Sequence, residues 1–203
     1  MITSVITGDI TNSREVSNDQ WMPVLKQVLN HYGEAPKDWE IFRGDSFQLE
    51  LTPDKAMVAA IHIKATVKQW RLLDVRMAIG IGTKSYGAEK ITEANGSAFI
   101  NSGEAFEALK KSMLAIKSDW PALDDEVNHY IELALLTMNN WPANAATMLK
   151  AAIEHQQLTQ QQLAAKLKRT QSTVSEGLKR AGHMEIFNME KRYRALLQRQ
   201  WHN

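Results

Sequence analysis

Two spacings of apolar residues divide the first 120 residues into predicted strands and helices. Short apolar or alternating runs at 2–10 ("ITSVITGDI") and 74–82 ("DVRMAIGIG") are typical of strands, whose successive side chains point to opposite faces. Between them, residues 17–33 repeat apolar side chains every three or four positions, as one face of a helix does. The chain is therefore expected to begin with a strand followed by an amphipathic helix.

The rest of this region extends the pattern to five strands and three helices. Residues 39–51 ("WEIFRGDSFQLEL") predict two short strands about a Gly44-Asp45 turn. Thr52 followed by Pro53 is typical of a helix start. A further helix and a last strand give the order β-α-β-β-α-β-α-β. We predict an α+β fold, a ferredoxin-like open sheet with helices on one face.

A helical connector is expected next, between two Trp-Pro pairs. Its apolar stripe either packs on the preceding domain or pairs with a second copy of the chain, as a homodimer; the stripe comprises Val127, Tyr130, Ile131, Ala134 and Met138. We thus predict three units: a sheet domain at 1–120, a connector at 121–141 and an all-helical domain at 142–203.

Residues 158–182 have the pattern of a helix-turn-helix. Thr159 and Thr170 are expected to cap two short helices separated by a tight turn. Small Ala164 would let the helices approach closely, and the predicted inward side chains are Leu163, Ala164, Leu167, Val174 and Leu178. A helical hairpin packed on its neighbour, with solvated basic residues, is the alternative interpretation.

In the helix-turn-helix interpretation, the start of the second helix meets base edges in the major groove. The predicted base-reading residues are Gln171, Ser172, Thr173 and Ser175. Contacts to phosphates or base edges are predicted for Arg169, Lys179 and Arg180. In the closing basic helix, Tyr193, Leu196 and Leu197 are expected in the core instead.

The charge distribution strengthens the expectation of duplex DNA as a partner. The 203 residues carry a net charge of +1, with 44% apolar and 23% charged residues, which is typical of a globular protein. Residues 1–140 hold 14 Lys and Arg against 19 Asp and Glu, about −5, whereas 141–203 hold 10 against 4, about +6. The basic end is the candidate for nucleic acid.

The absence of cysteine excludes disulfides, thiolate metal sites and a cysteine nucleophile, and is consistent with a reducing cytosol. The start of the chain lacks a basic segment followed by a long apolar run, so no signal peptide is expected. No window is apolar enough to predict a membrane span. We expect a cytoplasmic protein.

Two aspartates at strand ends are candidates for a metal site. Asp9 ends the first strand and Asp45 lies in the hairpin turn, so neighbouring strands would bring both carboxylates to one sheet edge. Two carboxylates and a main-chain carbonyl suit Mg²⁺. Aspartate is also common in turns, and Asp45 as a turn residue alone is the alternative.

Polar residues flank the aspartates and are candidates for phosphate binding. Arg14 and Arg43 would make bidentate phosphate contacts, or would be surface partners of the acids. Asn12 and Ser13 would add amide and hydroxyl contacts, or would only stabilise a turn.

The motifs "VITGDI", "WEIFRGDSFQL", "VRMAIGIG" and "NGSAFINSGEAF" together resemble the palm-like domain of class III nucleotidyl cyclases, over about residues 1–117. The resemblance implies that Asp9, the carbonyl of Ile10 and Asp45 bind Mg²⁺ or Mn²⁺. It also aligns Arg76, Gly82 and Gly96 with the family's later strand and last helix.

Several positions depart from the cyclase pattern. Ile41 stands where the family has a purine-reading Lys, and Gly80 replaces a His. Ile100 and Glu104 stand in the register of the Asn and Arg that serve the transition state, with Asn101 one residue out of step. Loss of that Arg argues against an efficient cyclase, because it stabilises charge in the transition state.

The motifs "ITGDI..SR", "RGDSFQ", "R.AIGIG" and "GSAF..SGEAF" are closer to those of the bacterial SatD family. Its members join such a domain to a C-terminal helix-turn-helix, so this resemblance spans the whole chain. It implies a fold and a layout rather than a reaction.

Two functions follow as hypotheses. The first is a DNA-binding regulator whose cyclase-like domain senses a nucleotide or a metal, or only dimerises. The second is a nucleotide-processing enzyme, cyclase-like or nucleotidyl-transferring, controlled by its basic end. A structural role for the aspartates, with only the helix-turn-helix functional, is the third possibility.

Overall fold

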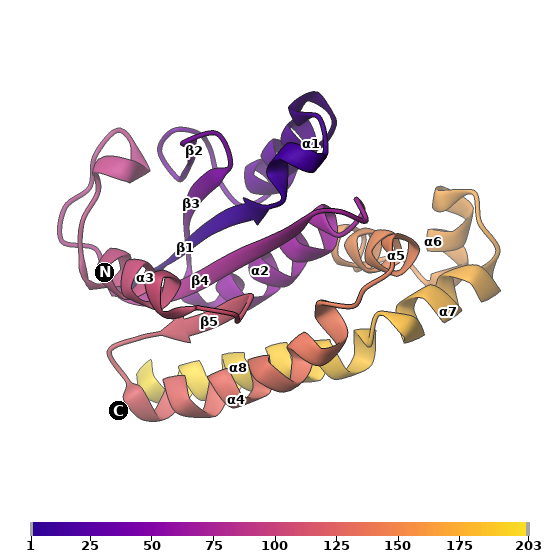
Figure 1. Ribbon diagram of the computed structural model, residues 1–203. Helices are drawn as coiled ribbons and strands as arrows, with labels where there is room; N and C mark the ends of the chain where they lie inside the picture. The colour runs from indigo at the N-terminus through magenta and orange to yellow at the C-terminus, as the bar shows by residue number, and fades with distance from the viewer. Residues whose placement is uncertain (1, 202–203) are drawn as a thin grey trace.

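The computed structural model describes residues 2–201, and its centre is a five-stranded sheet (Figure 1). The strands are β1 (Ile2–Thr11), β2 (Trp39–Phe42), β3 (Ser46–Leu51), β4 (Asp74–Thr83) and β5 (Leu114–Lys117), in the spatial order β2-β3-β1-β4-β5. Neighbours are antiparallel except for the parallel pair β4 and β5. The α+β class and the predicted order of strands and helices in this region are confirmed.

Eight α-helices surround and extend the sheet. The sheet region contains α1 (Asn18–Asn30), α2 (Pro53–Val67) and α3 (Ser97–Ala108), with short 3-10 turns at Ser13–Glu15 and Ile91–Glu93. The remainder of the described chain is helical: α4 (Pro121–Met138), α5 (Ala143–Glu154), α6 (Gln160–Leu167), α7 (Gln171–Arg180) and α8 (His183–Trp201). None of these helices is long and apolar enough to cross a membrane.

Helices cover both faces of the sheet, so the expectation of helices on one face was wrong. The large apolar residues of β4 (Met77, Ile79 and Ile81) join the main core with α2, whereas its alternate residues face α3. At Gly80, a Cβ atom would lie 2.2 Å from the carbonyl oxygen of Ala98. The small side of β4 therefore admits α3 at backbone contact, which a bulkier strand would prevent.

The main hydrophobic core extends from the sheet into the C-terminal helices. It contains α2 residues together with α4, α5 and α8 residues, including Tyr193, Leu196 and Leu197, which are buried as expected. The predicted connector stripe packs within the chain: Val127, Ile131 and Met138 are buried. The division at 120 and 141 stays a prediction, but α5 and α8 share a core with the sheet domain.

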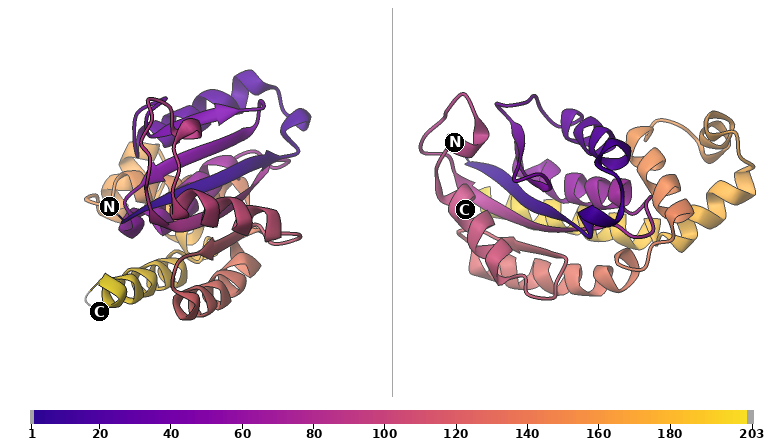
Figure 2. Two further views of the ribbon diagram at one scale, coloured as in Figure 1. Left: turned by 90° about the vertical axis from the view of Figure 1, so that its left-hand side faces the viewer. Right: turned by 45° about the horizontal axis from the view of Figure 1, so that its top comes forward.

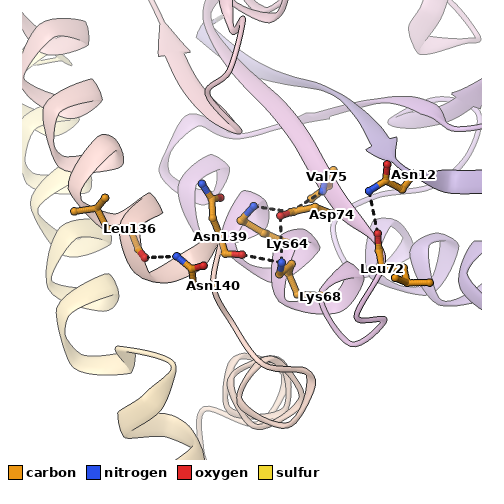
Figure 3. Close-up of polar contacts among 9 residues, drawn as sticks. All are labelled: Asn12, Lys64, Lys68, Leu72, Asp74, Val75, Leu136, Asn139 and Asn140. Carbon is orange, nitrogen blue, oxygen red and sulfur yellow. Dashed lines mark hydrogen bonds and ion pairs between the residues drawn. The ribbon is translucent and has the colours of Figure 1, made fainter. Parts of the chain in front are cut away.

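A buried ion network joins α2, β4 and the end of α4 (Figure 3). Lys64 is fully buried, and its Nζ lies 2.6 Å from Asp74 Oδ1. Lys68 Nζ lies 3.3 Å from Asp74 Oδ2 and donates to the Asn139 carbonyl at 2.8 Å. Burial lowers the pKa of Lys64, and Asp74 opposes this shift. The network thus fixes the α4–α5 corner against the sheet.

We expect Asp74→Ala to lower the free energy of unfolding by about 3–5 kcal/mol, because it leaves Lys64 charged and unpaired in the core. Lys64→Met should cost much less, because it removes the buried charge of Lys64 itself while Asp74 keeps its ion pair with Lys68. Chemical denaturation of both variants measures the difference. Asp125→Ala is the matched control, since that side chain is 82% exposed. Equal effects of Asp74→Ala and Lys64→Met would contradict this account.

A second polar contact joins α2, α5 and the turn after α1. His62 of α2 is fully buried; its Nδ1 lies 3.0 Å from the Tyr32 hydroxyl and its Nε2 lies 3.5 Å from Glu154 Oε1. Lys150 also pairs with Glu154, at 2.6 Å. Burial lowers the pKa of His62 despite Glu154, and the neighbouring His62 and Lys150 lower the pKa of Glu154 to about 2.

These pKa shifts predict two windows of acid destabilisation. His62 resists protonation in the folded chain, so stability should fall as pH drops below about 6.5, where the unfolded chain takes up a proton. Glu154 stabilises the folded chain above its usual pKa, and this contribution is lost between about pH 4.5 and 2. His62→Gln should remove the first window.

Denaturation at several pH values measures these slopes. His129→Gln is the control, because that histidine is exposed and its pKa is raised by the Asp125 carbonyl. The first window is wrongly assigned to His62 if the His62→Gln variant loses as much stability between pH 7 and 5 as the wild type does.

Candidate functional site

The two candidate aspartates lie at the same end of the sheet, where β1 lies between β3 and β4. Asp9 of β1 is paired in register with Ser46 of β3 on one side and with Arg76 of β4 on the other. The Ile10 amide donates to the Asp45 carbonyl at 3.1 Å, which fixes the hairpin turn beside the end of β1. The expected convergence of the strand ends is therefore present. We call Asp9, Ser13, Asp45 and Arg76 the strand-end cluster.

Arg76 occupies both oxygens of the Asp9 carboxylate. Its Nε donates to Oδ1 at 3.0 Å and its terminal nitrogen donates to Oδ2 at 2.5 Å, in a bidentate ion pair. The hydrogen bonds to Asp9 raise the pKa of Arg76. The guanidinium carbon also lies 5.4 Å from the ring centre of Phe106 in α3. Asp9 thus already has a positively charged partner within the protein.

Asp45 lies in the turn between β2 and β3, and a residue outside that turn binds its carboxylate. Its Oδ2 accepts a hydrogen bond from the Ser13 hydroxyl at 2.7 Å. The preceding residues, Arg43 with φ 54° and Gly44 with φ 92°, are both left-handed, which lets a three-residue turn connect β2 and β3. Asp45 is therefore a turn residue whose carboxylate is hydrogen-bonded to Ser13.

The side chains of the four residues predicted to bind phosphate are not hydrogen-bonded to one another and share no partner in residues 2–201. The Asn12 side chain donates to the Leu72 carbonyl at 3.2 Å (Figure 3), and Ser13 is engaged by Asp45. Arg14 and Arg43 are exposed and make no ion pair within the described residues. Their phosphate role stays a prediction.

The cyclase resemblance implies a metal ion bound by the oxygen atoms of Asp9, Ile10 and Asp45. Two carboxylates and the Ile10 carbonyl are suitable in type for Mg²⁺ or Mn²⁺. However, a cation at Asp9 would have to displace the Arg76 guanidinium from both oxygens. Among residues 2–200, no group of three His, Asp or Glu side chains is placed to hold a metal. The cluster as arranged does not fit a metal, and the metal assignment stays a prediction.

The positions that depart from the cyclase pattern have structural roles here. Gly80 lies at the close contact with α3. Asn101 is buried and donates to the Ile81 carbonyl at 2.8 Å and to Asp119 at 3.0 Å. Glu104 pairs with Lys117 of β5. In this arrangement the Asn101 amide is already engaged by the Ile81 carbonyl and by Asp119.

We expect the wild-type melting temperature to change little with millimolar Mg²⁺ or Mn²⁺, because Arg76 already neutralises Asp9. Arg76→Gln should gain a metal-dependent rise, since it leaves two uncompensated carboxylates, and adding Asp45→Asn should remove that rise. Thermal shift with and without a nucleotide panel measures this. A wild-type rise that Asp9→Asn or Asp45→Asn abolishes would establish the metal site instead.

A second candidate site lies in the C-terminal helices, where α6 and α7 are joined by only three residues. Thr159 caps α6 in a reciprocal pair with Gln162, and the Thr170 hydroxyl accepts from the Thr173 amide at the start of α7. Lys168 in the joint is left-handed and closes α6. Both caps and both helices lie where the sequence predicts them.

A small core holds α7 on α5. It comprises Met148, Ala151, Leu163, Ala164, Val174 and Leu178. At Gly177 a Cβ atom would lie 2.7 Å from Met148 Cγ, so glycine permits this close packing. The helix pair lies at the end of the molecule opposite the marked termini (Figure 2, right).

The predicted DNA-contacting residues are exposed, but they fall into two groups. The first group lies at the start of α7 and comprises Arg169, Gln171, Ser172, Thr173 and Ser175. Lys166 at the end of α6 and Lys168 in the joint are exposed as well, and neither was among the predicted contacts. Lys179 and Arg180 lie at the other end of α7, where they line a groove between α4 and α8. Spacing along the chain alone did not show this separation.

Arg76 is the residue of the strand-end cluster whose role sequence reasoning missed. It was matched to the cyclase strand but not to Asp9. The only signal is the register of β1 against β4, which places the two side chains opposite each other on one sheet face.

Comparison with known proteins gives a family but no curated relative. No curated protein matches the chain. A solved structure of a bacterial light-regulated adenylyl cyclase is similar at 13% identity and a TM-score of 0.39, over 57% of this chain and 42% of the cyclase chain. The family model of the SatD family matches residues 1–197, almost the whole chain. The chain belongs to the SatD family.

Proposed function

We propose that this protein binds duplex DNA through the exposed start of α7. The proposal rests on how α7 is oriented: one face is buried against α5 and the start of the helix is exposed. Val174, Gly177 and Leu178 hold one face of α7 on α5, while Gln171, Ser172, Thr173 and Ser175 are exposed. A short helix fixed by its apolar face and displaying small polar side chains at its start has the form of a recognition helix.

The charges around this surface favour a polyanion. Lys166, Lys168 and Arg169 are exposed beside the start of α7. Between 159 and 180 the only acidic residue is Glu176. Basic side chains around a polar helix would contact phosphates and orient the helix, whereas the polar side chains would contact bases.

A regulatory role extends the proposal to the whole chain. The sheet domain would sense a nucleotide or other ligand, and α5 links that domain to the proposed DNA-binding pair, because α5 shares a core with α2 on one side and packs against α7 on the other. The sensor role and the cytoplasmic location stay expectations.

The enzyme alternative receives less support from the geometry. Asp9 is paired with Arg76, and Asn101 and Glu104 of α3 are engaged elsewhere. A cyclase-like reaction would require these groups to rearrange before any of them could meet a substrate.

We expect the full-length protein to bind random-sequence duplex DNA at low salt, with an affinity that falls steeply as salt rises, because phosphate contacts release counterions. The full chain is used because α5 and α8 share the core of the sheet domain. Arg169→Ala should weaken binding on all sequences, whereas Gln171→Ala should alter sequence preference more than overall affinity. Fluorescence anisotropy with a selected and a random duplex separates the two effects.

Lys111→Ala is the matched control, because it removes one exposed charge from the sheet domain. It should leave DNA affinity almost unchanged. Absence of binding at low salt, or an equal loss in Lys111→Ala and Arg169→Ala, would refute the proposal.

A further inference from the structure

A groove between α4 and α8 is not used by either candidate site. Its volume is about 850 Å³, and its apolar floor includes Ala134 of α4 with Ile186 and Met189 of α8. Figure 1 shows α4 and α8 side by side along one edge of the molecule. Lys179 and Arg180, at the end of α7, stand at one end of the groove.

Two leucines of α4 are exposed at this groove: Leu133 is one of its lining residues, and Leu136 lies three residues further along the helix. Leu133 is 67% exposed and Leu136 is 71% exposed, one helical turn from each other on the outer side of α4. The inner side of the same helix is already packed in the core. Exposed apolar residues next to a groove and bordered by charges mark an interaction surface.

The charges on the two sides of α4 have opposite signs. On the groove side, Lys179 and Arg180 outnumber the one exposed acid of the lining, Glu185, and neither cation makes an ion pair within the described part of the chain. On the other side, Glu132 lines the surface towards β5 and α3, also without an ion pair there. Exposed Asp125, whose carboxylate lies 3.9 Å from the Nδ1 atom of His129, adds to the acidic side.

The partner that fits a basic, apolar groove is an acidic amphipathic helix with leucines on its outer side. Helix α4 of this same chain is such a helix. A surface that carries both the groove and the matching helix is self-complementary, as a two-fold symmetric interface requires.

We propose that this surface binds a second copy of the chain, so that Leu133 and Leu136 of each protomer enter the α4–α8 groove of its partner. The acidic residues beside the leucines would then meet Lys179 and Arg180 of the partner. This inference goes beyond the proposed DNA binding and does not depend on it.

The test is the mass of the full-length protein in solution as a function of concentration. Sedimentation equilibrium should give twice the 23.0 kDa chain mass for the wild type. Leu133→Lys combined with Leu136→Lys should weaken self-association by roughly tenfold or more, as loss of central interface residues commonly does. Lys179→Glu combined with Arg180→Glu should also weaken it, because these changes place like charges together.

Leu72→Lys is the matched control: Leu72 is 55% exposed but lies away from the groove, so this variant should remain dimeric. Circular dichroism melting verifies that each variant is folded. A wild type that is monomeric at its highest soluble concentration, or a dimer that persists in the folded double-lysine variant, would overturn the proposal.

Discussion

Helix α2 is enclosed on every side, and the positions of the other elements depend on how its surface is covered. Twelve of its fifteen residues are buried. The sheet covers one side, α1 another, and α5 and α8 the rest. A helix that is buried around almost its whole circumference cannot lie at a surface, so the sheet domain is completed only when the C-terminal helices have packed onto it.

Polar side chains on α2 make this packing specific. Lys64 requires Asp74 at the start of β4, and His62 lies between Tyr32 in the turn after α1 and Glu154 of α5. Buried polar groups tolerate few alternative positions, because an unpaired one is costly in an apolar interior. Any change in the sheet domain that moves α2 would also move α5, which carries the α6–α7 pair.

The strand-end cluster brings two carboxylates to one end of the sheet and pairs one of them with a cation of the protein itself. Arg76 of the neighbouring strand supplies the positive charge beside Asp9. A bidentate ion pair between adjacent strands holds the end of the sheet together without an added ion. The contacts of the cluster therefore give it a structural role at this end of the sheet.

The sequence by itself determined the elements and their order, because local spacing and local capping suffice for that. The strand alternation, the Gly44 turn, the Pro53 helix start and the Thr159 and Thr170 caps all depend on residues within a few positions of each other. Local pattern also placed Asp45 in the hairpin turn and Asp9 near the end of the first strand, although β1 continues past Asp9 to Thr11.

Only the tertiary structure decided which distant residues meet. The pairing of Asp9 with Arg76 depends on strand register, and the second covered face of the sheet depends on the small residues Ala78, Gly80 and Gly82 being opposite α3. The position of Lys179 and Arg180 at the α4–α8 groove depends on how α7 packs. Local pattern carries no information on these contacts, because each is set by the packing of segments far apart in the chain.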